Sequence, residues 1–227
     1  EHIPLQQLTG EQGFMGLTFN VNEHVLIPRQ DTEILVEEVL KELHDGMRVL
    51  DMCTGSGCIL LSLLHYSNDC EGLGVDLSAE ALEVAGRNVL KVLTPEKAEH
   101  AHFLQSDLFE KVEGKFEIIV SNPPYIASAE VEKLMPEVRD HEPRMALDGT
   151  EDGLYFYRRI IEEAGKYLVS SGMLFFEIGY DQGQAVSELM RTEGYCEVQV
   201  VQDYAGLDRV VFGTYVTVQP APFAKSR

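Results

Sequence analysis

Short apolar runs alternate with amphipathic segments along most of this chain, and this alternation restricts the fold more than any other sequence feature. The runs that predict strands lie at 47–52, 72–77, 102–107, 116–122 and 173–178. The segments that predict helices lie at 31–43, after Gly57, and at 78–93, 151–168 and 182–193. Asp31 or Thr32 is the expected cap of the first helix, and Ser78 is the expected cap of the helix at 78–93. Repeated strand–helix units form parallel sheets with helices on both faces. The sequence therefore predicts an α/β fold with a doubly wound, mostly parallel sheet.

Antiparallel hairpins are expected at both ends of this unit. Residues 14–27 alternate loosely around a turn-like Asn22-Glu23 pair, which predicts an N-terminal β-hairpin. Strands at 196–203 and 209–216 are close enough in sequence to pair, and they bring the sheet to seven strands. The predicted organisation is a hairpin and linker (1–30), one α/β domain (31–216) and a disordered tail (217–227).

Charge and composition restrict the partners and the compartment. The chain has 18 Lys and Arg against 38 Asp and Glu, a formal net charge of −20 at pH 7, so no direct nucleic-acid partner is expected. No apolar run reaches the roughly 18 residues of a membrane span, and no signal peptide is recognisable, which indicates a cytoplasmic protein without membrane contact. The four cysteines form no C-x-x-C pair and the seven histidines are scattered, which predicts reduced thiols and no metal site. We expect a monomer.

A glycine-rich segment, V-L-D-M-C-T-G-S-G-C at 49–58, follows the first strand of the domain. In open α/β sheets, ligands bind beyond the carboxyl ends of the strands, where the strand order reverses. Gly55 and Gly57 allow a tight turn that a ligand can approach, and Asp51 adds a carboxylate at the strand end. Asp76 ends the next strand, where a carboxylate can bind two ribose hydroxyls. Since the spacing matches neither G-x-G-x-x-G nor G-K-[ST], these residues indicate a nucleotide-like ligand other than NAD or ATP.

A second motif, S-N-P-P-Y at 121–125, follows the fourth strand of the domain and is expected at the same crevice. Two prolines in series stiffen the backbone and leave carbonyl oxygens as acceptors, and the Asn122 side chain adds another acceptor. Tyr125 supplies a flat face. Such a set suits a planar, weakly nucleophilic nitrogen with two N–H bonds, which it can aim at an electrophile. Catalysis would then depend mostly on orientation and electrostatic complementarity, with no covalent intermediate. A rigid Pro-Pro turn with a capping Asn is the structural alternative.

These motifs resemble those of a known family. D-x-x-x-G-x-G joined to N-P-P-Y is similar to the methyltransferases of the seven-strand class that use S-adenosylmethionine. More narrowly, the sequence resembles the release factor glutamine methyltransferases. The segments that carry this resemblance are P-L-Q-Q-L-T-G (4–10), V-L-I-P-R-Q-D-T-E (25–33), Q-S-D-L-F (105–109), S-N-P-P-Y-I (121–126), E-P-R-M-A-L-D-G (142–149), D-G-L-Y-F-Y (152–157) and F-F-E-I-G (175–179).

The resemblance implies a Rossmann-like class I methyltransferase fold. It also implies methyl transfer from S-adenosyl-L-methionine to the side-chain amide of the Gly-Gly-Gln glutamine in bacterial peptide chain release factors, which modulates translation termination. S-adenosyl-L-homocysteine is the implied product.

The same resemblance assigns residues by position. Those implied at the methyl donor are Asp51, Cys53, Thr54, Gly55, Gly57, Asp76, Asp107, Leu108 and Asn122. Those implied at the acceptor are Arg29, Asn122, Pro123, Pro124 and Tyr125, with Asn122, Pro123 and Tyr125 implied in catalysis. Arg29 can instead pair with Asp31 or Glu33, and Glu177 is a further candidate that can also be only a strand-end residue.

Two departures from the family pattern are visible. Cys53 stands where the family usually has glycine, which predicts a slightly displaced donor turn. The family also carries a helical domain ahead of P-L-Q-Q-L-T-G, whereas this chain starts near that motif. Since that domain helps to dock the protein substrate, we expect this chain to bind the donor better than the release factor.

The closest rival function is an adenine-N methyltransferase that acts on DNA or RNA, because the adenine amine is also planar and poorly nucleophilic. Such an enzyme flips its target base and holds a charged backbone, which a net charge of −20 does not favour. A non-catalytic scaffold of the same fold predicts a broken motif, and both motifs are intact. A small-molecule methyltransferase is the remaining alternative, against which the release-factor segments argue.

Overall fold

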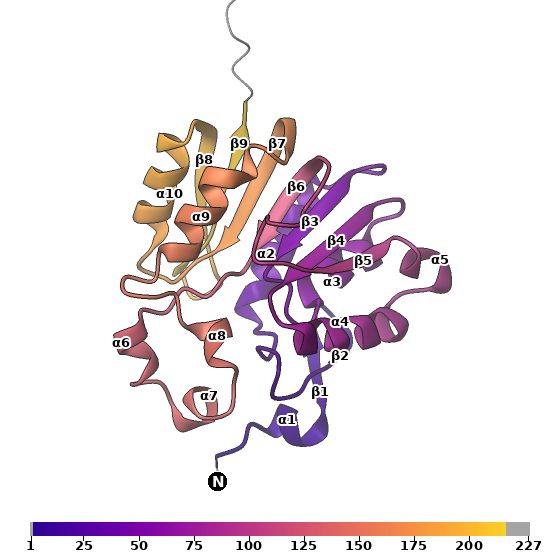
Figure 1. The fold of residues 1–227 in the computed structure, drawn as a ribbon, viewed down its shortest axis with the longest axis vertical. Coiled ribbons are helices and arrows are strands. Elements are labelled where there is room, and N and C mark those ends of the chain that lie inside the picture. Colours follow the sequence, from indigo (N-terminus) through magenta and orange to yellow (C-terminus); the bar gives the residue numbers. More distant parts are fainter. Residues whose placement is uncertain (1, 217–227) are drawn as a thin grey trace, which may run out of the picture.

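Seven strands form one twisted sheet through the centre of the molecule (Figure 1). The computed structural model describes residues 2–216, so the expected tail at 217–227 lies outside the described residues. The strands of the sheet are β3 (Arg48–Met52), β4 (Glu71–Asp76), β5 (Ala101–Gln105), β6 (Phe116–Ser121), β7 (Leu168–Glu177), β8 (Tyr195–Gln202) and β9 (Asp208–Tyr215). Their order is β5-β4-β3-β6-β7-β9-β8, and β9 runs antiparallel to both neighbours. The predicted doubly wound, mostly parallel sheet with an antiparallel C-terminal hairpin is confirmed.

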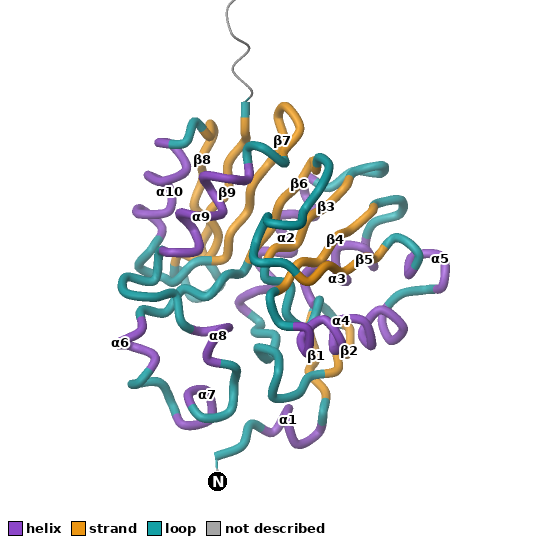
Figure 2. The backbone as a smooth tube through the Cα atoms, viewed as in Figure 1, coloured by secondary structure: helices purple, strands orange, loops and turns teal. Residues whose placement is uncertain are grey.

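Helices cover both faces of this sheet (Figure 2). The long helices are α2 (Asp31–Glu42), α3 (Cys58–Tyr66), α4 (Ala79–Val92), α9 (Tyr155–Ala164) and α10 (Gly183–Thr192). The shorter helices are α1 (Leu5–Thr9), α5 (Pro95–Ala98), α6 (Ser128–Val131), α7 (Pro136–Arg139) and α8 (Arg144–Leu147). In the part of the chain that the structure describes, no helix combines the length and apolar character of a membrane span.

Strand alternation divides the core into two layers. On one face, Val49 of β3 and Phe175 of β7 pack in a cluster with α2, α3 and α4. On the other face, Leu50 and Phe176 pack with α9 and α10. Because side chains alternate along a strand, each buried strand supplies both layers, and this explains its continuous apolar sequence.

The N-terminal hairpin exists, but its predicted position is wrong. β1 (Glu11–Phe14) pairs antiparallel with β2 (Leu17–Asn20) around a Met15-Gly16 turn, whereas the sequence pattern predicted a turn at Asn22-Glu23. Met15 and Gly16 both have positive φ, which a tight hairpin turn requires. The apolar residues at 21–27 belong to a loop, because they are buried by tertiary packing rather than by strand pairing.

Several predicted boundaries also differ. Helix α2 begins at Asp31 with Gln30 as N-cap and has no side-chain cap, so neither Asp31 nor Thr32 caps it. Ser78 does cap α4, since its hydroxyl accepts a hydrogen bond from the Ala81 amide. Helix α9 is shorter than predicted. Strand β7 begins five residues earlier than predicted, and its register against β6 shifts between Leu168 and Met173. The long connection at 123–150 contains three short helices.

The turn between β3 and α3 has an unusual backbone. Gly55 and Gly57 have φ of 54° and 78°, and Gly57 is also the N-cap of α3. A Cβ on Gly57 would lie 3.2 Å from the Ala85 Cβ, so glycine allows α3 and α4 to approach. Cys53 precedes them with φ 64°, a conformation in which the Cβ of an L-residue crowds the backbone. The turn therefore holds one strained non-glycine residue.

We expect Cys53→Gly to be more stable than Cys53→Ala by about 1 kcal/mol, because glycine adopts this backbone without the Cβ clash that alanine keeps. At a residue with negative φ, alanine is expected to give the more stable protein, since glycine loses more backbone entropy on folding. Ala127, at φ −58°, is the control, and Ala127→Gly should lower the free energy of unfolding. Equilibrium urea unfolding measures all three variants. Equal stability of the two Cys53 variants would contradict a strained backbone at this position.

Candidate functional site

A cavity of about 220 Å³ lies at the carboxyl ends of the central strands. The strand order reverses between β3 and β6, so the turns that follow these two strands open side by side. Met52, Val75 and Asn122 line the cavity at the ends of β3, β4 and β6. The cavity therefore lies where ligands bind in open α/β sheets.

Most of the residues predicted from the sequence lie at this cavity. Those that line it are Arg29, Cys53, Thr54, Gly55, Asp76, Asp107, Leu108, Asn122 and Pro124. Among the other predicted residues, Asp51 is fully buried beneath the glycine-rich turn, and Gly57 packs between two helices. Pro123 and Tyr125 are not among the residues that line the cavity, although they belong to the same motif as Asn122 and Pro124. The two ends of the predicted site, which are far apart in the sequence, are thus brought together.

Asp51 anchors the glycine-rich turn from below. Its Oδ2 accepts a hydrogen bond of 2.6 Å from the Thr54 hydroxyl, and the Thr54 amide donates to the Val75 carbonyl of β4. Its Oδ1 is buried and has no hydrogen-bond partner among the described residues. Burial raises the pKa of Asp51 to about 7, with the Asp76 carboxylate as a smaller contribution. Asp51 thus changes its charge near neutral pH and keeps an unused acceptor.

Asp76 joins the glycine-rich turn to the start of α4. Its Oδ2 accepts a hydrogen bond from the Gly55 amide, and its Oδ1 accepts one from the Ser78 amide. Burial raises the pKa of Asp76, although these backbone amides stabilise the charged form. A carboxylate fixed at both oxygens keeps further lone pairs for hydroxyl donors at the cavity.

Asp107 and Leu108 line the cavity at the edge that follows β5. Leu108 is buried with φ 46°, which turns the backbone at this edge. The Asp107 carboxylate accepts a hydrogen bond of 2.9 Å from Arg159 of α9 and is 44% exposed. This edge is apolar beside Leu108 and polar at its rim, and both features suit a purine with an attached ribose.

Asn122 has a free side chain at the cavity. Within residues 2–216, its amide forms no hydrogen bond, although it is only partly exposed. The residue before it is fixed, because the Ser121 hydroxyl donates a 2.6 Å hydrogen bond to the Met52 carbonyl of β3. Two buried prolines follow. The Asn122 carbonyl oxygen and amine are therefore held on a rigid backbone and remain available to a ligand.

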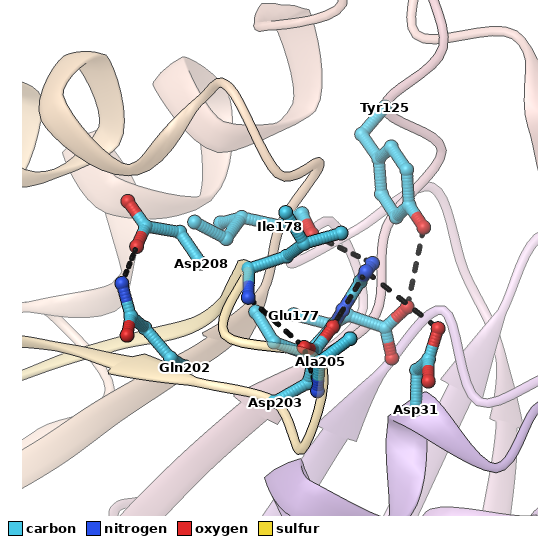
Figure 3. Close-up of polar contacts among 10 residues, drawn as sticks. Asp31, Tyr125, Glu177, Ile178, Gln202, Asp203, Ala205 and Asp208 are labelled. Carbon is cyan, nitrogen blue, oxygen red and sulfur yellow. Dashed lines mark hydrogen bonds and ion pairs between the residues drawn. The ribbon is translucent and has the colours of Figure 1, made fainter.

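The Tyr125 hydroxyl is hydrogen-bonded to a buried carboxylate. Its hydroxyl donates a 3.2 Å hydrogen bond to Glu177 Oε1 at the end of β7 (Figure 3). Burial is the main cause that raises the pKa of both Tyr125 and Glu177. Arg209 lies near this pair and binds Asp203 at 3.0 Å and Asp31 at 3.6 Å. Glu177 is thus more than a strand-end residue, because it holds the tyrosine of the motif.

Sequence reasoning missed the support beneath the Asn-Pro-Pro-Tyr motif. Ile126 pairs with residues 147–149, where its amide donates to the Leu147 carbonyl and its carbonyl accepts from the Gly149 amide. A Cβ on Gly153 would lie 2.3 Å from the Tyr125 carbonyl oxygen, so this glycine allows close packing. Gln182 also donates to that carbonyl. The glycines of D-G-T-E-D-G were the available signal, but their partner was visible only in the fold.

Arg29 pairs with a residue that the sequence did not suggest. Its guanidinium donates to Glu142, which lies 113 positions away in the long connection. Asp31 instead lies near Arg209, and Glu33 accepts a hydrogen bond from the Met15 amide. Neither of the sequence-local partners of Arg29 is therefore used.

Taken together, the cavity combines carboxylates, an open glycine turn and a free amide. A Cβ on Gly55 would meet open space, so a ligand can approach the backbone there. The unpartnered oxygen of Asp51 suits a ligand with a positive charge, and the fixed carboxylate of Asp76 suits a ligand with ribose hydroxyls. Among the described residues, no group of three His, Cys, Asp or Glu is arranged to hold a metal ion.

Solved structures similar to this chain include two methyltransferases. One, titled a methyltransferase from Pyrococcus furiosus, is 18% identical, with a TM-score of 0.63 over 90% of this chain and 92% of the other, and it bears on the fold alone. The other is titled a protein-(glutamine-N5) methyltransferase (release factor-specific) from Alicyclobacillus acidocaldarius. It is 32% identical, with a TM-score of 0.50 over 88% of this chain and 100% of the other.

The sequence comparisons are more specific than the fold. Residues 29–138 match the Methyltransferase small domain family. A release factor glutamine methyltransferase from Thermodesulfovibrio yellowstonii is 44% identical over 92% of this chain and 75% of the relative. Another, from Moorella thermoacetica, is 47% identical over 91% of this chain and 73% of the relative. The chain belongs to the release factor glutamine methyltransferase family.

Proposed function

We propose that this protein transfers a methyl group from S-adenosyl-L-methionine to the side-chain amide nitrogen of the Gly-Gly-Gln glutamine in peptide chain release factors. Family membership supports the reaction class and the acceptor. The observation that carries the proposal at the level of residues is the free amide of Asn122 on a rigid Pro-Pro backbone beside the cavity. An amide acceptor presents two N–H donors, and this motif offers side-chain and carbonyl acceptors for both.

In the proposed mechanism, the chain acts by orientation and charge. The bound donor supplies an electrophilic methyl carbon on a positively charged sulfur. The Asn122 side-chain oxygen and the Pro123 carbonyl accept hydrogen bonds from the two N–H groups of the acceptor amide. These two hydrogen bonds direct the amide nitrogen at that carbon. Methyl transfer to this nitrogen would leave the electron pair of the broken S–C bond on the sulfur of the donor. The proton displaced from the nitrogen would pass to solvent. Tyr125, held by Glu177, packs against the planar amide.

The donor is assigned to the glycine-rich side of the cavity. We infer that Cys53, Thr54, Gly55 and Gly57 surround it, that Asp76 binds its ribose, and that Asp107 and Leu108 lie beside the adenine. Asp51 opposes its positive charge from below the turn. The proposal is supported by the fixed carboxylate of Asp76 and the unpartnered oxygen of Asp51.

Adenine methylation of DNA or RNA is less well supported. The reported relatives carry the release factor name, and a chain with a net charge of −20 is poorly suited to neutralise phosphates. The two functions are separated by offering labelled S-adenosylmethionine with a bacterial release factor and with adenine-containing DNA in parallel. Label on the release factor that disappears when its Gly-Gly-Gln glutamine is replaced supports the proposal. Label on the DNA alone would overturn it.

We expect Asn122→Ala to lower methyl transfer by about 10²–10³-fold, because one preorganised acceptor for the amide is lost. Donor affinity should stay close to that of the wild type, since the described contacts of the donor side do not involve the Asn122 side chain. Single-turnover label transfer and calorimetric titration of the donor measure the two quantities. An equal loss of both would indicate that Asn122 is structural.

Donor affinity should rise by about tenfold between pH 6 and pH 8, because Asp51, with a pKa of about 7, is mostly neutral at the lower pH. The sign follows from the donor's positive charge, which favours the ionised carboxylate and lowers its pKa on binding. Calorimetric titration at several pH values measures the effect. Asp51→Asn is the control, since it cannot ionise and should flatten the profile. A wild-type affinity that does not change with pH would remove Asp51 from the donor site.

A further inference from the structure

An ion pair between the buried Glu142 and the half-exposed Arg29 links two segments that line the cavity. The Glu142 side chain is 1% exposed although it lies in the long connection after β6. Its Oε1 accepts a hydrogen bond from the Arg29 guanidinium, and its Oε2 accepts one of 3.0 Å from the Ile27 amide. Buried carboxylates without such partners are strongly disfavoured, so this arrangement depends on both donors.

The two segments that Glu142 joins both line the cavity. Leu26, Pro28 and Arg29 belong to one segment, and Pro143, Met145 and Ala146 belong to the other. Arg29 is 40% exposed and Met145 is 48% exposed, which places both segments at the cavity mouth. The two segments are more than 110 residues apart in the sequence. A further contact lies next to the pair, where the Gln7 side chain donates to the His141 carbonyl. Glu142 therefore connects the two segments at the cavity mouth.

Arg29 keeps unused hydrogen-bond donors at this mouth. Its side chain is 40% exposed and lines the cavity, whereas its Glu142 partner is buried. A guanidinium has five N–H donors in a fixed plane, and the ion pair occupies only part of them. Because Glu142 neutralises the charge of Arg29, the mouth offers directed donors without a net positive charge. Such donors suit the neutral carbonyl oxygens of a polypeptide better than the phosphates of a nucleic acid.

We propose that Glu142 is a positioning residue for the polypeptide acceptor, which it serves by holding Arg29 where the guanidinium binds main-chain carbonyl oxygens beside the methylated side chain. This inference rests on the proposed function for the identity of the acceptor. It assigns Glu142 no contact with the reacting atoms.

Only a carboxylate satisfies this place. Arg29 and the Ile27 amide both donate, so two acceptor oxygens are needed. The glutamine side chain has one acceptor oxygen and one NH2 group. In either orientation of its amide, the NH2 group therefore faces an N–H donor of Arg29 or of Ile27. Aspartate keeps both oxygens on a stem that is one methylene shorter. The expected order of function is therefore wild type, then Glu142→Asp, then Glu142→Gln.

The test compares Glu142→Gln and Glu142→Asp with Glu132→Gln, which removes the partner of Arg144 from an exposed ion pair in the same connection. For each variant, KM and kcat for a bacterial release factor are measured, together with calorimetric donor affinity. Hydrogen exchange of the peptide that covers 24–29 is followed in parallel, with α3 as an internal reference. Hydrogen exchange is measured without a release factor, so it reports on residues 24–29 independently of the methylation assay.

In Glu142→Gln we expect KM for the release factor to rise by about tenfold, with donor affinity unchanged and faster exchange at 24–29. Glu142→Asp should recover part of the KM, and Glu132→Gln should match the wild type. Unchanged exchange at 24–29 would overturn the inference, and so would faster exchange with an unchanged KM. An equal loss of donor and acceptor binding would indicate general destabilisation and overturn it as well. A wild type that labels no release factor would refute the proposed function and, with it, the acceptor role of Glu142, while the exchange result still decides whether Glu142 fixes the segment.

Discussion

The site depends on the parallel pairing of β3 with β6 at the centre of the sheet. Their register opposes Met52 to Ser121, and the Ser121 hydroxyl binds the Met52 carbonyl at the point where both strands end. Parallel strands end at the same edge, so the glycine-rich turn and the Asn-Pro-Pro-Tyr motif open side by side. A shift of one residue in this register would turn every side chain of a strand to the other face.

Four carboxylates lie at or near the cavity, and their hydrogen-bond partners differ. Asp76 is held at both oxygens by backbone amides, and Glu142 is held by an amide and a guanidinium. Asp51 and Glu177 each keep one oxygen without a hydrogen-bond partner in the described part of the chain. Low dielectric surroundings make such groups sensitive to a nearby charge. In the proposed function, Asp51 responds in this way to the positive charge of the methyl donor, and Glu177 holds the Tyr125 hydroxyl.

Much of the fold could be predicted, because the buried strands and amphipathic helices leave clear periodic patterns. Ser78 was recognisable as a cap, and Gly55 and Gly57 as a turn, since these depend on neighbours in sequence. The N-terminal turn was misplaced because residues 21–27 are apolar for tertiary reasons, and such a run is indistinguishable from a strand by pattern. The register shift between β6 and β7 could not be predicted either, because it exists only in the pairing of two strands that are distant in sequence.

The sequence by itself determined the fold class, the two motifs and the resemblance that links them, because each depends on residue types at short, regular spacing. Only the tertiary structure decided the partners of the charged side chains. Arg29 has acidic neighbours at positions 31 and 33 but pairs with Glu142, and Tyr125 is held by Glu177 from another strand. Such pairs join segments that are distant in sequence and meet only when the sheet forms. Their geometry is a property of the packed chain, and no local pattern encodes it.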